Sequence, residues 1–300
     1  MVNNFVQDQL QAYREKNEDR GRLIIKCPDQ PGIVATVTAF LKEYGANIVE
    51  LSQYSMNPNG GTFFTRIEFD CPGLKAKSGD MEKEFQEISE RFSMQWTFNY
   101  VSDLKRTAIF VSKEPHCLLE LLWEWQSGNL LADIAIVISN HEDNREIVES
   151  MNIPFYYIPA NKDIRKEVEA QQLKLLEDYK IDLIVLARYM QILTPEFVAA
   201  HPNRIINIHH SFLPAFIGAR PYERAYARGV KLIGATSHYV TNDLDEGPII
   251  EQDIERVDHR DSAEEMKKIG RSAERRVLAH AVKWHLEDRV LVHENKTVVF

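Results

Sequence analysis

The sequence predicts an α/β protein with two domains: a ferredoxin-like α+β domain over residues 21–101 and a Rossmann-like domain with a mostly parallel sheet over residues 105–300. Three observations support this prediction. The first hundred residues read strand, helix, strand, strand, helix, strand, which is the ferredoxin-like order. Continuous apolar runs then alternate with helical stretches, which is typical of parallel strands buried on both faces. A chain of 300 residues is also longer than a single core usually needs.

The elements of the first part follow from local patterns. After a polar leader, strands are expected at residues 21–27, 47–56, 62–70 and 95–101, and helices at 33–44 and 78–93. In the first helix Ile33, Val37 and Leu41 recur at helical spacing, and Gly45 supplies the stop. The asparagine- and glycine-rich residues 57–61 predict a hairpin turn. Residues 102–107 are expected to form a short linker.

The second part alternates between strands and helices. Strands are expected at residues 107–112, 133–139, 155–160, 182–187 and 204–208, and helices at 116–128, 144–152 and 162–180. This alternation favours right-handed crossovers. A late antiparallel pair is expected at residues 231–240 and 248–257, then a long helix over 261–288 and a closing hairpin over 289–300. Ser262 and Glu265 form a capping box at the start of the long helix.

Composition limits the class of protein. The formal charge of −9 argues against a nucleic-acid partner, because no basic excess exists to displace counterions. Cys27, Cys71 and Cys117 are an odd number and none is spaced as CxxC, so neither a disulfide framework nor a cysteine zinc site is expected. The N-terminus lacks the apolar core of a signal peptide, and no stretch approaches the ~20 apolar residues of a membrane span. We therefore expect a cytoplasmic protein without a membrane partner.

The most informative stretch is "IINIHHSFLPAF", residues 205–216. On a strand Asn207 and His209 point to one side and His210 to the other, and Pro214 ends the element. Ligands of open parallel sheets bind beyond the carboxyl ends of the strands, so an amide and an imidazole there could polarise a carbonyl and move a proton. On residue types alone, polar groups that merely cap a strand are the favoured interpretation.

Other kinds of site find less support in the sequence. His209 and His210 are adjacent on a strand and diverge, so they do not readily chelate one metal ion, and HExxH is absent. A hydrolase nucleophile such as Ser211 or Ser237 would need a GxSxG elbow, which does not occur. The phosphate-binding patterns GxGxxG and GxxxxGK are also missing. No metal and no cofactor is expected.

Two ordered motifs resemble the formyltransferase-fold family over roughly residues 105 to 300. "NIHHSFLPAFIGARPYERAY" carries the Asn-x-His and Ser-x-Leu-Pro of that family, and "GATSHYVTNDLDEGPIIEQ" carries its aspartate before Gly-Pro. The resemblance places the catalytic trio on Asn207, His209 and Asp245. It implies that Asn207 donates to a formyl oxygen, that His209 donates as well or delivers a proton, and that Asp245 orients His209 or takes a proton from water.

The same resemblance implies a folate substrate. "ARYMQIL", residues 187–193, looks like the segment whose backbone meets the pterin ring. The residues that the resemblance implies as folate contacts are Met190, Gln191, Ile192, Leu193, His238 and Val240. Further candidates to line the cleft are Lys113, Asn140, His141, Gly218, Ala219, Arg220 and Tyr222, although Arg220 or Tyr222 could equally be packing residues.

The first part resembles an ACT domain, a ferredoxin-like module that commonly binds amino acids. The resemblance rests on the Asp-x-Pro-Gly turn and on Gly-Ala-Asn-Ile in "IIKCPDQPGIVATVTAFLKEYGANIVELSQYS". It implies an amino-acid effector near Asp29, Gly32, Ile33 and Asn47 and a homo-oligomer, with a dimer of dimers as the expectation. A purely structural dimerisation role remains open.

An ACT module before a formyltransferase-type domain resembles the deformylase branch of that fold. It implies a hydrolase of a linear amide that converts 10-formyltetrahydrofolate to formate and tetrahydrofolate, supplying formate for purine synthesis and balancing one-carbon folate pools. Purine-pathway transferases resemble one another in a Gly-Ser-Asn phosphate loop after the first strand, where this chain has Lys113 and Glu114, and in a proline at the position of His210. Formyl transfer to an unidentified amine and a non-catalytic amino-acid sensor remain alternatives.

Overall fold

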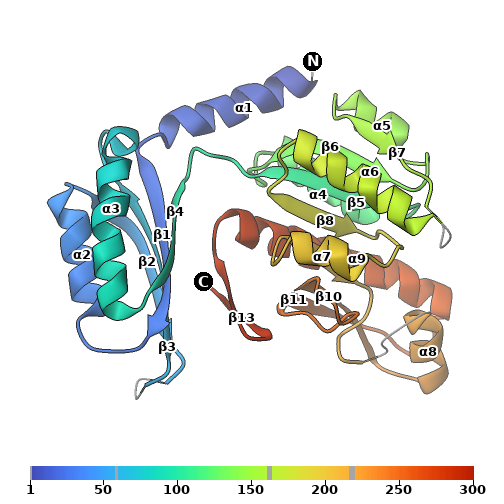
Figure 1. Cartoon of the computed structure of the whole chain (residues 1–300). Helices are drawn as coiled ribbons and strands as arrows, with labels where there is room; N and C mark the ends of the chain where they lie inside the picture. Colours follow the sequence, from blue (N-terminus) through green and yellow to red (C-terminus); the bar gives the residue numbers. More distant parts are fainter. Residues whose placement is uncertain (1, 58–59, 161–163, 216–219) are drawn as a thin grey trace. The chain divides into compact units, whose positions relative to one another are not determined.

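The computed structural model describes residues 2–57, 60–160, 164–215 and 220–300, and side chains from residue 5 onward. The chain forms two compact units (Figure 1). The N-terminal unit comprises Gln7–Leu104, Glu287–Leu291 and Val298–Phe300. The C-terminal unit comprises Lys105–Leu286 and Val292–Thr297, with residues 2–6 grouped with it.

The N-terminal unit contains a four-stranded antiparallel sheet. Its strands are β1 (Arg20–Pro28), β2 (Asn47–Ser55), β3 (Thr62–Asp70) and β4 (Gln95–Tyr100), in the order β2-β3-β1-β4. The helices α2 (Ile33–Glu43) and α3 (Leu74–Phe92) pack on one face and bury an apolar core that includes Ile25, Phe69 and Phe85. The ferredoxin-like fold expected from the sequence is confirmed, and α3 begins four residues before the expected helix at residue 78.

Helix α1 (Val2–Lys16) was not expected, because its sequence is mostly polar. Only Val6 and Leu10 are deeply buried on it among the side chains described, so the apolar signal is too sparse to indicate a helix. The exposed helix is supported by local contacts such as the hydrogen bond from Gln11 to Glu15.

The C-terminal unit contains a seven-stranded mixed sheet in the order β11-β10-β9-β8-β5-β6-β7. The strands are β5 (Arg106–Val111), β6 (Asp133–Ser139), β7 (Phe155–Tyr157), β8 (Leu183–Ala187), β9 (Ile205–His209), β10 (Leu232–Tyr239) and β11 (Ile249–Arg256). Strands β5 to β9 are parallel to one another, whereas β10 pairs antiparallel with both β9 and β11. This mixed topology confirms the predicted parallel sheet with a late antiparallel pair.

Helices connect the strands of this unit and cover its sheet (Figure 1). They are α4 (His116–Gln126), α5 (Arg145–Ser150), α6 (Arg165–Asp178), α7 (Pro195–Ala200), α8 (Pro221–Arg228) and α9 (Ala263–Leu286). Helix α9 starts at the predicted capping box, in which Ser262 N–H donates to Glu265 and Glu265 N–H donates to Ser262 Oγ. The short α7 and α8 were not predicted, since six and eight residues give too little periodicity.

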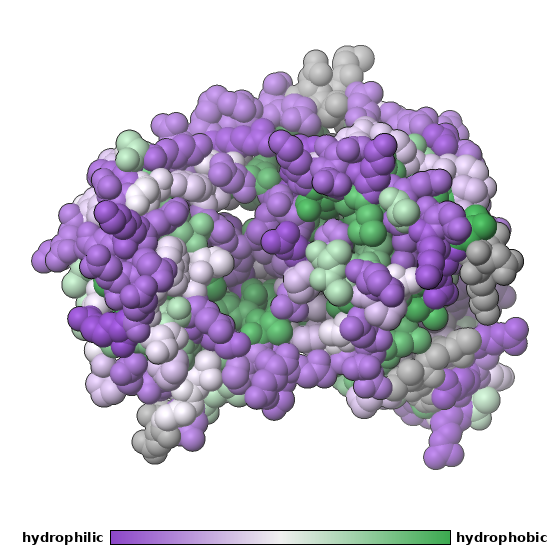
Figure 2. Space-filling model, in the orientation of Figure 1, coloured by the Kyte–Doolittle hydropathy of each residue, from purple (hydrophilic) through white to green (hydrophobic). Residues whose placement is uncertain are grey.

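The chain ends in the hairpin of β12 (Val290–His293) and β13 (Lys296–Val299), as the sequence predicted. Hydrophilic residues predominate on the face drawn in Figure 2, in keeping with a chain of which 27% is charged. No helix in the described ranges combines the length and the apolar character that crossing a membrane requires.

Candidate active site

The junction of β9 and β10 pairs Asn207 with His238. The two residues are direct partners in the antiparallel register, and Asn207 Nδ2 lies 3.2 Å from His238 Nε2. His238 Nδ1 lies 2.9 Å from the Tyr239 carbonyl oxygen, so Nδ1 carries the hydrogen and Nε2 accepts from the Asn207 amide. Burial lowers the pKa of His238 despite its hydrogen bond to Tyr239, which keeps the ring neutral and preserves this arrangement. The sequence placed His238 among the folate contacts but gave no sign of this pairing.

His209 and Asp245 form the second pair of the site. His209 Nδ1 lies 3.3 Å from Asp245 Oδ1, and His209 is 5% exposed. Its other ring nitrogen, Nε2, is buried and has no hydrogen-bond partner in the described part of the chain. Such an unsatisfied buried group carries a cost and calls for a functional reason. The free nitrogen is the group of His209 that a substrate could meet.

The loop between β10 and β11 delivers Asp245 in an unusual backbone conformation. Asp245 has a φ of 59°, in the left-handed region that few non-glycine residues adopt. Two residues on, an added Cβ on Gly247 would lie 1.8 Å from the Tyr239 carbonyl oxygen. The Asp-Glu-Gly-Pro sequence therefore folds into a turn that aims the carboxylate at His209, and only glycine fits at its closest approach.

Asp245 is ionised in this setting. Burial raises the pKa of its carboxyl, but the hydrogen bond with His209 acts in the opposite direction, and the pKa lies below its usual range. His238 Nε2 is 3.8 Å from the same oxygen, Asp245 Oδ1. The structure thus brings together Asn207, His209 and Asp245, the trio named from the sequence, and adds His238 to the same site.

The predicted folate segment follows β8 and is tied to the end of β5. Met190 N–H donates to Ser112 Oγ at 2.9 Å, and Ser112 Oγ donates to Asn140 Oδ1 at 2.7 Å. The side chains of Met190 and Ile192 are 57% and 54% exposed, an unusual display of apolar surface on neighbouring residues. Leu193 and Val240 instead pack against the core of this unit, and Gln191 borders a small cavity beside Tyr189.

The remaining cleft candidates occupy different environments. Lys113 is exposed, and His141 is half-buried after β6 with its backbone N–H bonded to Ser139. Arg220 is exposed and begins α8 with a φ of 54°. Tyr222 is buried and donates its hydroxyl to Glu274. Gly218 and Ala219 lie outside the described residues.

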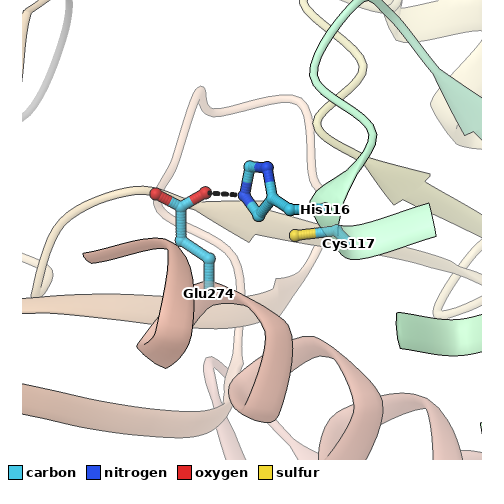
Figure 3. A group of neighbouring side chains, drawn as sticks. All are labelled: His116, Cys117 and Glu274. Carbon is cyan, nitrogen blue, oxygen red and sulfur yellow. Dashed lines mark hydrogen bonds and ion pairs between the residues drawn. The ribbon is translucent and has the colours of Figure 1, made fainter. Parts of the chain in front are cut away.

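A buried ionic cluster beside the site was missed from the sequence. Figure 3 shows His116 and Cys117 of α4 facing Glu274 of α9, with His116 Nε2 2.7 Å from Glu274 Oε2. Glu274 is 1% exposed, and Arg188 Nε lies 3.4 Å from the same oxygen. The signal that could have found it is a glutamate on the apolar stripe of α9, directly after the buried Ala273.

The donor chemistry of this cluster does not favour a metal ion. Both Glu274 oxygens already accept hydrogen bonds, from His116 and from Tyr222. The Arg188 guanidinium beside them would repel a cation. Burial raises the pKa of the Cys117 thiol well above its usual value, so the thiolate that binds metals is disfavoured.

Comparison with known proteins finds families, sequences and solved structures that are similar to this chain. Residues 105–282 match the formyl transferase family and residues 21–83 match the ACT domain. The formyltetrahydrofolate deformylase of Bacillus subtilis strain 168 is 69% identical over 299 residues, which covers 100% of both chains. The crystal structure of a formyltetrahydrofolate deformylase from Pseudomonas syringae superposes with a TM-score of 0.91 at 47% identity, over 97% of this chain and 99% of that one.

A second group of structures matches less of the chain. Glycinamide ribonucleotide transformylase 1 from Symbiobacterium toebii gives a TM-score of 0.62 at 29% identity, over 66% of this chain and 94% of that one. The match to the deformylases extends through both units. The chain therefore belongs to the formyltetrahydrofolate deformylase family, with an ACT domain ahead of its formyl transferase domain.

Proposed function

We propose that this deformylase hydrolyses 10-formyltetrahydrofolate to formate and tetrahydrofolate at Asn207, His209 and Asp245. The observation that carries the assignment is the buried Nε2 of His209, which has no protein partner in the described residues while Nδ1 is held by Asp245. A positioned base whose other nitrogen is oriented by a carboxylate is the arrangement that proton transfer requires.

Asn207 stabilises the oxygen of the formyl group. One of its amide hydrogens is donated to His238 Nε2, which fixes the side chain and leaves the second hydrogen for the substrate. As water attacks the formyl carbon, the carbonyl oxygen gains negative charge, and a fixed donor favours that state over the ground state. His238 therefore acts by orienting Asn207.

His209 moves the proton. Its Nε2 takes a proton from water as the new C–O bond forms, and Asp245 stabilises the resulting imidazolium. His209 then returns the proton to N10 as the C–N10 bond breaks, giving tetrahydrofolate and formate. Asp245 stays ionised throughout, in agreement with its lowered pKa.

The loop after β5 supports water, and not a phosphorylated amine, as the acceptor. Glu114 lies there, and its carboxylate pairs with Lys267 at 2.9 Å and Arg271 at 2.7 Å on α9. Burial raises the pKa of Glu114, but these two cations outweigh burial and lower it, so the group is an anion. A phosphate at this loop would meet a negative charge and two cations that are already occupied.

The exposed apolar side chains of Met190 and Ile192 suit one face of the pterin ring, and the backbone of this segment suits its polar edge. The predicted contacts at Gln191, Leu193 and Val240 belong to the same proposal. His238 is assigned instead to the support of Asn207.

The N-terminal unit is proposed to bind an amino-acid effector and to assemble the enzyme as a homo-oligomer. Gly32 begins α2 with a φ of 95°, Ile33 is buried behind it, and the Asp29 carboxylate accepts from Ser55. The free N–H groups of a helix start suit a carboxylate. Asn47, exposed at the start of β2, completes the set predicted from the sequence.

A folate-absorbance assay without any amine tests the hydrolase directly. Formation of tetrahydrofolate and equimolar formate with water alone is the expected result. Turnover that appears only when an amine is added would favour formyl transfer, and its absence under both conditions would favour a sensor.

A further inference from the structure

We infer that Glu274 is a positioning residue for the reaction. It binds the Tyr222 hydroxyl, and the neighbouring rings of Tyr222 and His210 form a row that supports the catalytic His209. This inference rests on the proposed role of His209. Glu274 itself has no contact with the trio, so its effect would pass through other side chains.

The row can be followed contact by contact. The Tyr222 hydroxyl donates to Glu274 Oε1 at 2.7 Å, which fixes the ring at the start of α8. The Tyr222 ring lies 6.1 Å from the His210 ring at an interplanar angle of 36°. The His210 ring in turn lies 5.3 Å from the His209 ring at 33°. The chain thus places the tilted imidazole of His210 between the buried tyrosine and the catalytic base.

Helix α9 is shaped to hold Tyr222. An added Cβ on Gly270 would lie 2.1 Å from the Tyr222 hydroxyl oxygen. The missing side chain of Gly270 and the carboxylate of Glu274, one turn later on the same helix, therefore form one socket for the hydroxyl. A glycine inside a helix is otherwise unfavourable, so the socket accounts for its presence.

The charges around His210 are balanced by the same carboxylate. The groups that face His210 are Arg188 after β8, Glu274 on α9, His209 on β9 and Asp245 in the β10–β11 loop. Burial and the Arg188 charge lower the pKa of His210 to about 3, so it is neutral. Without Glu274, the Arg188 charge would be uncompensated and would disfavour the imidazolium that His209 forms during turnover.

Three variants of the full-length enzyme test the inference. Glu274→Gln keeps the shape and removes the charge, Gly270→Ala fills the socket, and Glu264→Gln makes the same chemical change on the exposed face of α9 as a control. We expect kcat to fall on the order of tenfold to a hundredfold for the first two, the usual effect of removing a supporting contact. KM should change little, and Glu264→Gln should match the wild type.

The pH profile distinguishes positioning from simple destabilisation. In Glu274→Gln the acid limb of the kcat/KM profile should move to lower pH, whereas partial unfolding would lower the rate equally at every pH. If Glu274→Gln fails to fold, Gly270→Ala decides, since it removes no polar group. A wild-type rate and profile in a folded Glu274→Gln or Gly270→Ala protein would overturn the inference. Full activity in His209→Ala would instead overturn the proposed function.

Discussion

Each side chain of the proposed catalytic trio depends on a partner for its hydrogen-bonding state. Asn207 is oriented by His238, and His209 is oriented by Asp245. Replacing Asn207, His209 or Asp245 by alanine should reduce kcat by on the order of 10²–10³ while the fold, checked by circular dichroism, is kept. Because they act together, the Asn207 and His209 double variant should lose less than the product of the single losses. Full activity in any single variant would remove that residue from the mechanism.

His238, the histidine beside Asn207, is already engaged in a way that does not suit a metal. His238 uses both ring nitrogens, one toward the Tyr239 carbonyl and one toward Asn207. Hydrolysis should therefore survive exhaustive treatment with a chelator, measured on the same preparation before and after. Activity that vanishes with chelator and returns with zinc would require His209, His210 and His238, or the His116 and Cys117 cluster, to be reinterpreted as ligands.

At the scale of an element, the β10–β11 turn determines where Asp245 lies. Since a Cβ on Gly247 would lie 1.8 Å from the Tyr239 carbonyl oxygen, Gly247→Ala must shift the turn. We expect a loss of activity comparable to that of Asp245→Ala, although no catalytic atom is removed. Gly229→Ala is a useful comparison, because it strains a glycine with a φ of 70°, whereas Gly247 has no positive φ, and the Cβ added at Gly229 meets no neighbouring atom within 4 Å. Equal activity of the two variants would contradict this account of the turn.

Helix α9 carries a buried charge whose ionisation is linked to stability. Burial raises the pKa of Glu274, but His116 and Arg188 outweigh it and lower the pKa from 4.5 to about 2. A carboxyl with a lowered folded-state pKa stabilises the fold above its unfolded pKa, and this contribution is lost as pH falls through the folded value. Between pH 4.5 and about 2, the free energy of unfolding should therefore fall more steeply in the wild type than in Glu274→Gln. Parallel denaturation curves at several pH values would measure this, and identical slopes would contradict it.

At the scale of the whole molecule, the residues that follow α9, Glu287–Leu291, belong to the N-terminal unit. Asp288, just after α9, accepts hydrogen bonds from Arg22 and Asn99, and Arg66 donates to the carbonyl of Glu287. Deleting the first hundred residues would leave these groups without their partners. A point variant in the full chain is therefore the cleaner test of regulation than a truncation.

An amino acid that binds the N-terminal unit must favour one conformational state of the enzyme if it is to change turnover. We expect a screen of the common amino acids against the wild type to find such an effector. Gly32→Ala should weaken the response, because alanine is strained at a φ of 95°. The experiment compares effector titrations of the two proteins, with oligomer size measured alongside. An effector that acts equally on both would place the regulatory site away from this turn.

The sequence by itself determined most of the elements, because apolar periodicity is a local pattern, and through short motifs that resemble the formyltransferase family it predicted the trio. Apolar periodicity predicted the strands of both sheets, and short ordered motifs placed Asn207, His209 and Asp245. Helices with a weak or brief apolar pattern, such as α1, α7 and α8, were not predicted.

Only the tertiary structure decided the partners of the proposed catalytic groups. The pairing of Asn207 with His238 depends on the register of two antiparallel strands. The meeting of Glu274 with Tyr222, 52 residues away in the chain, depends on how α8 and α9 pack. Such contacts are fixed by the path of the backbone through space, which no local spacing of residues records.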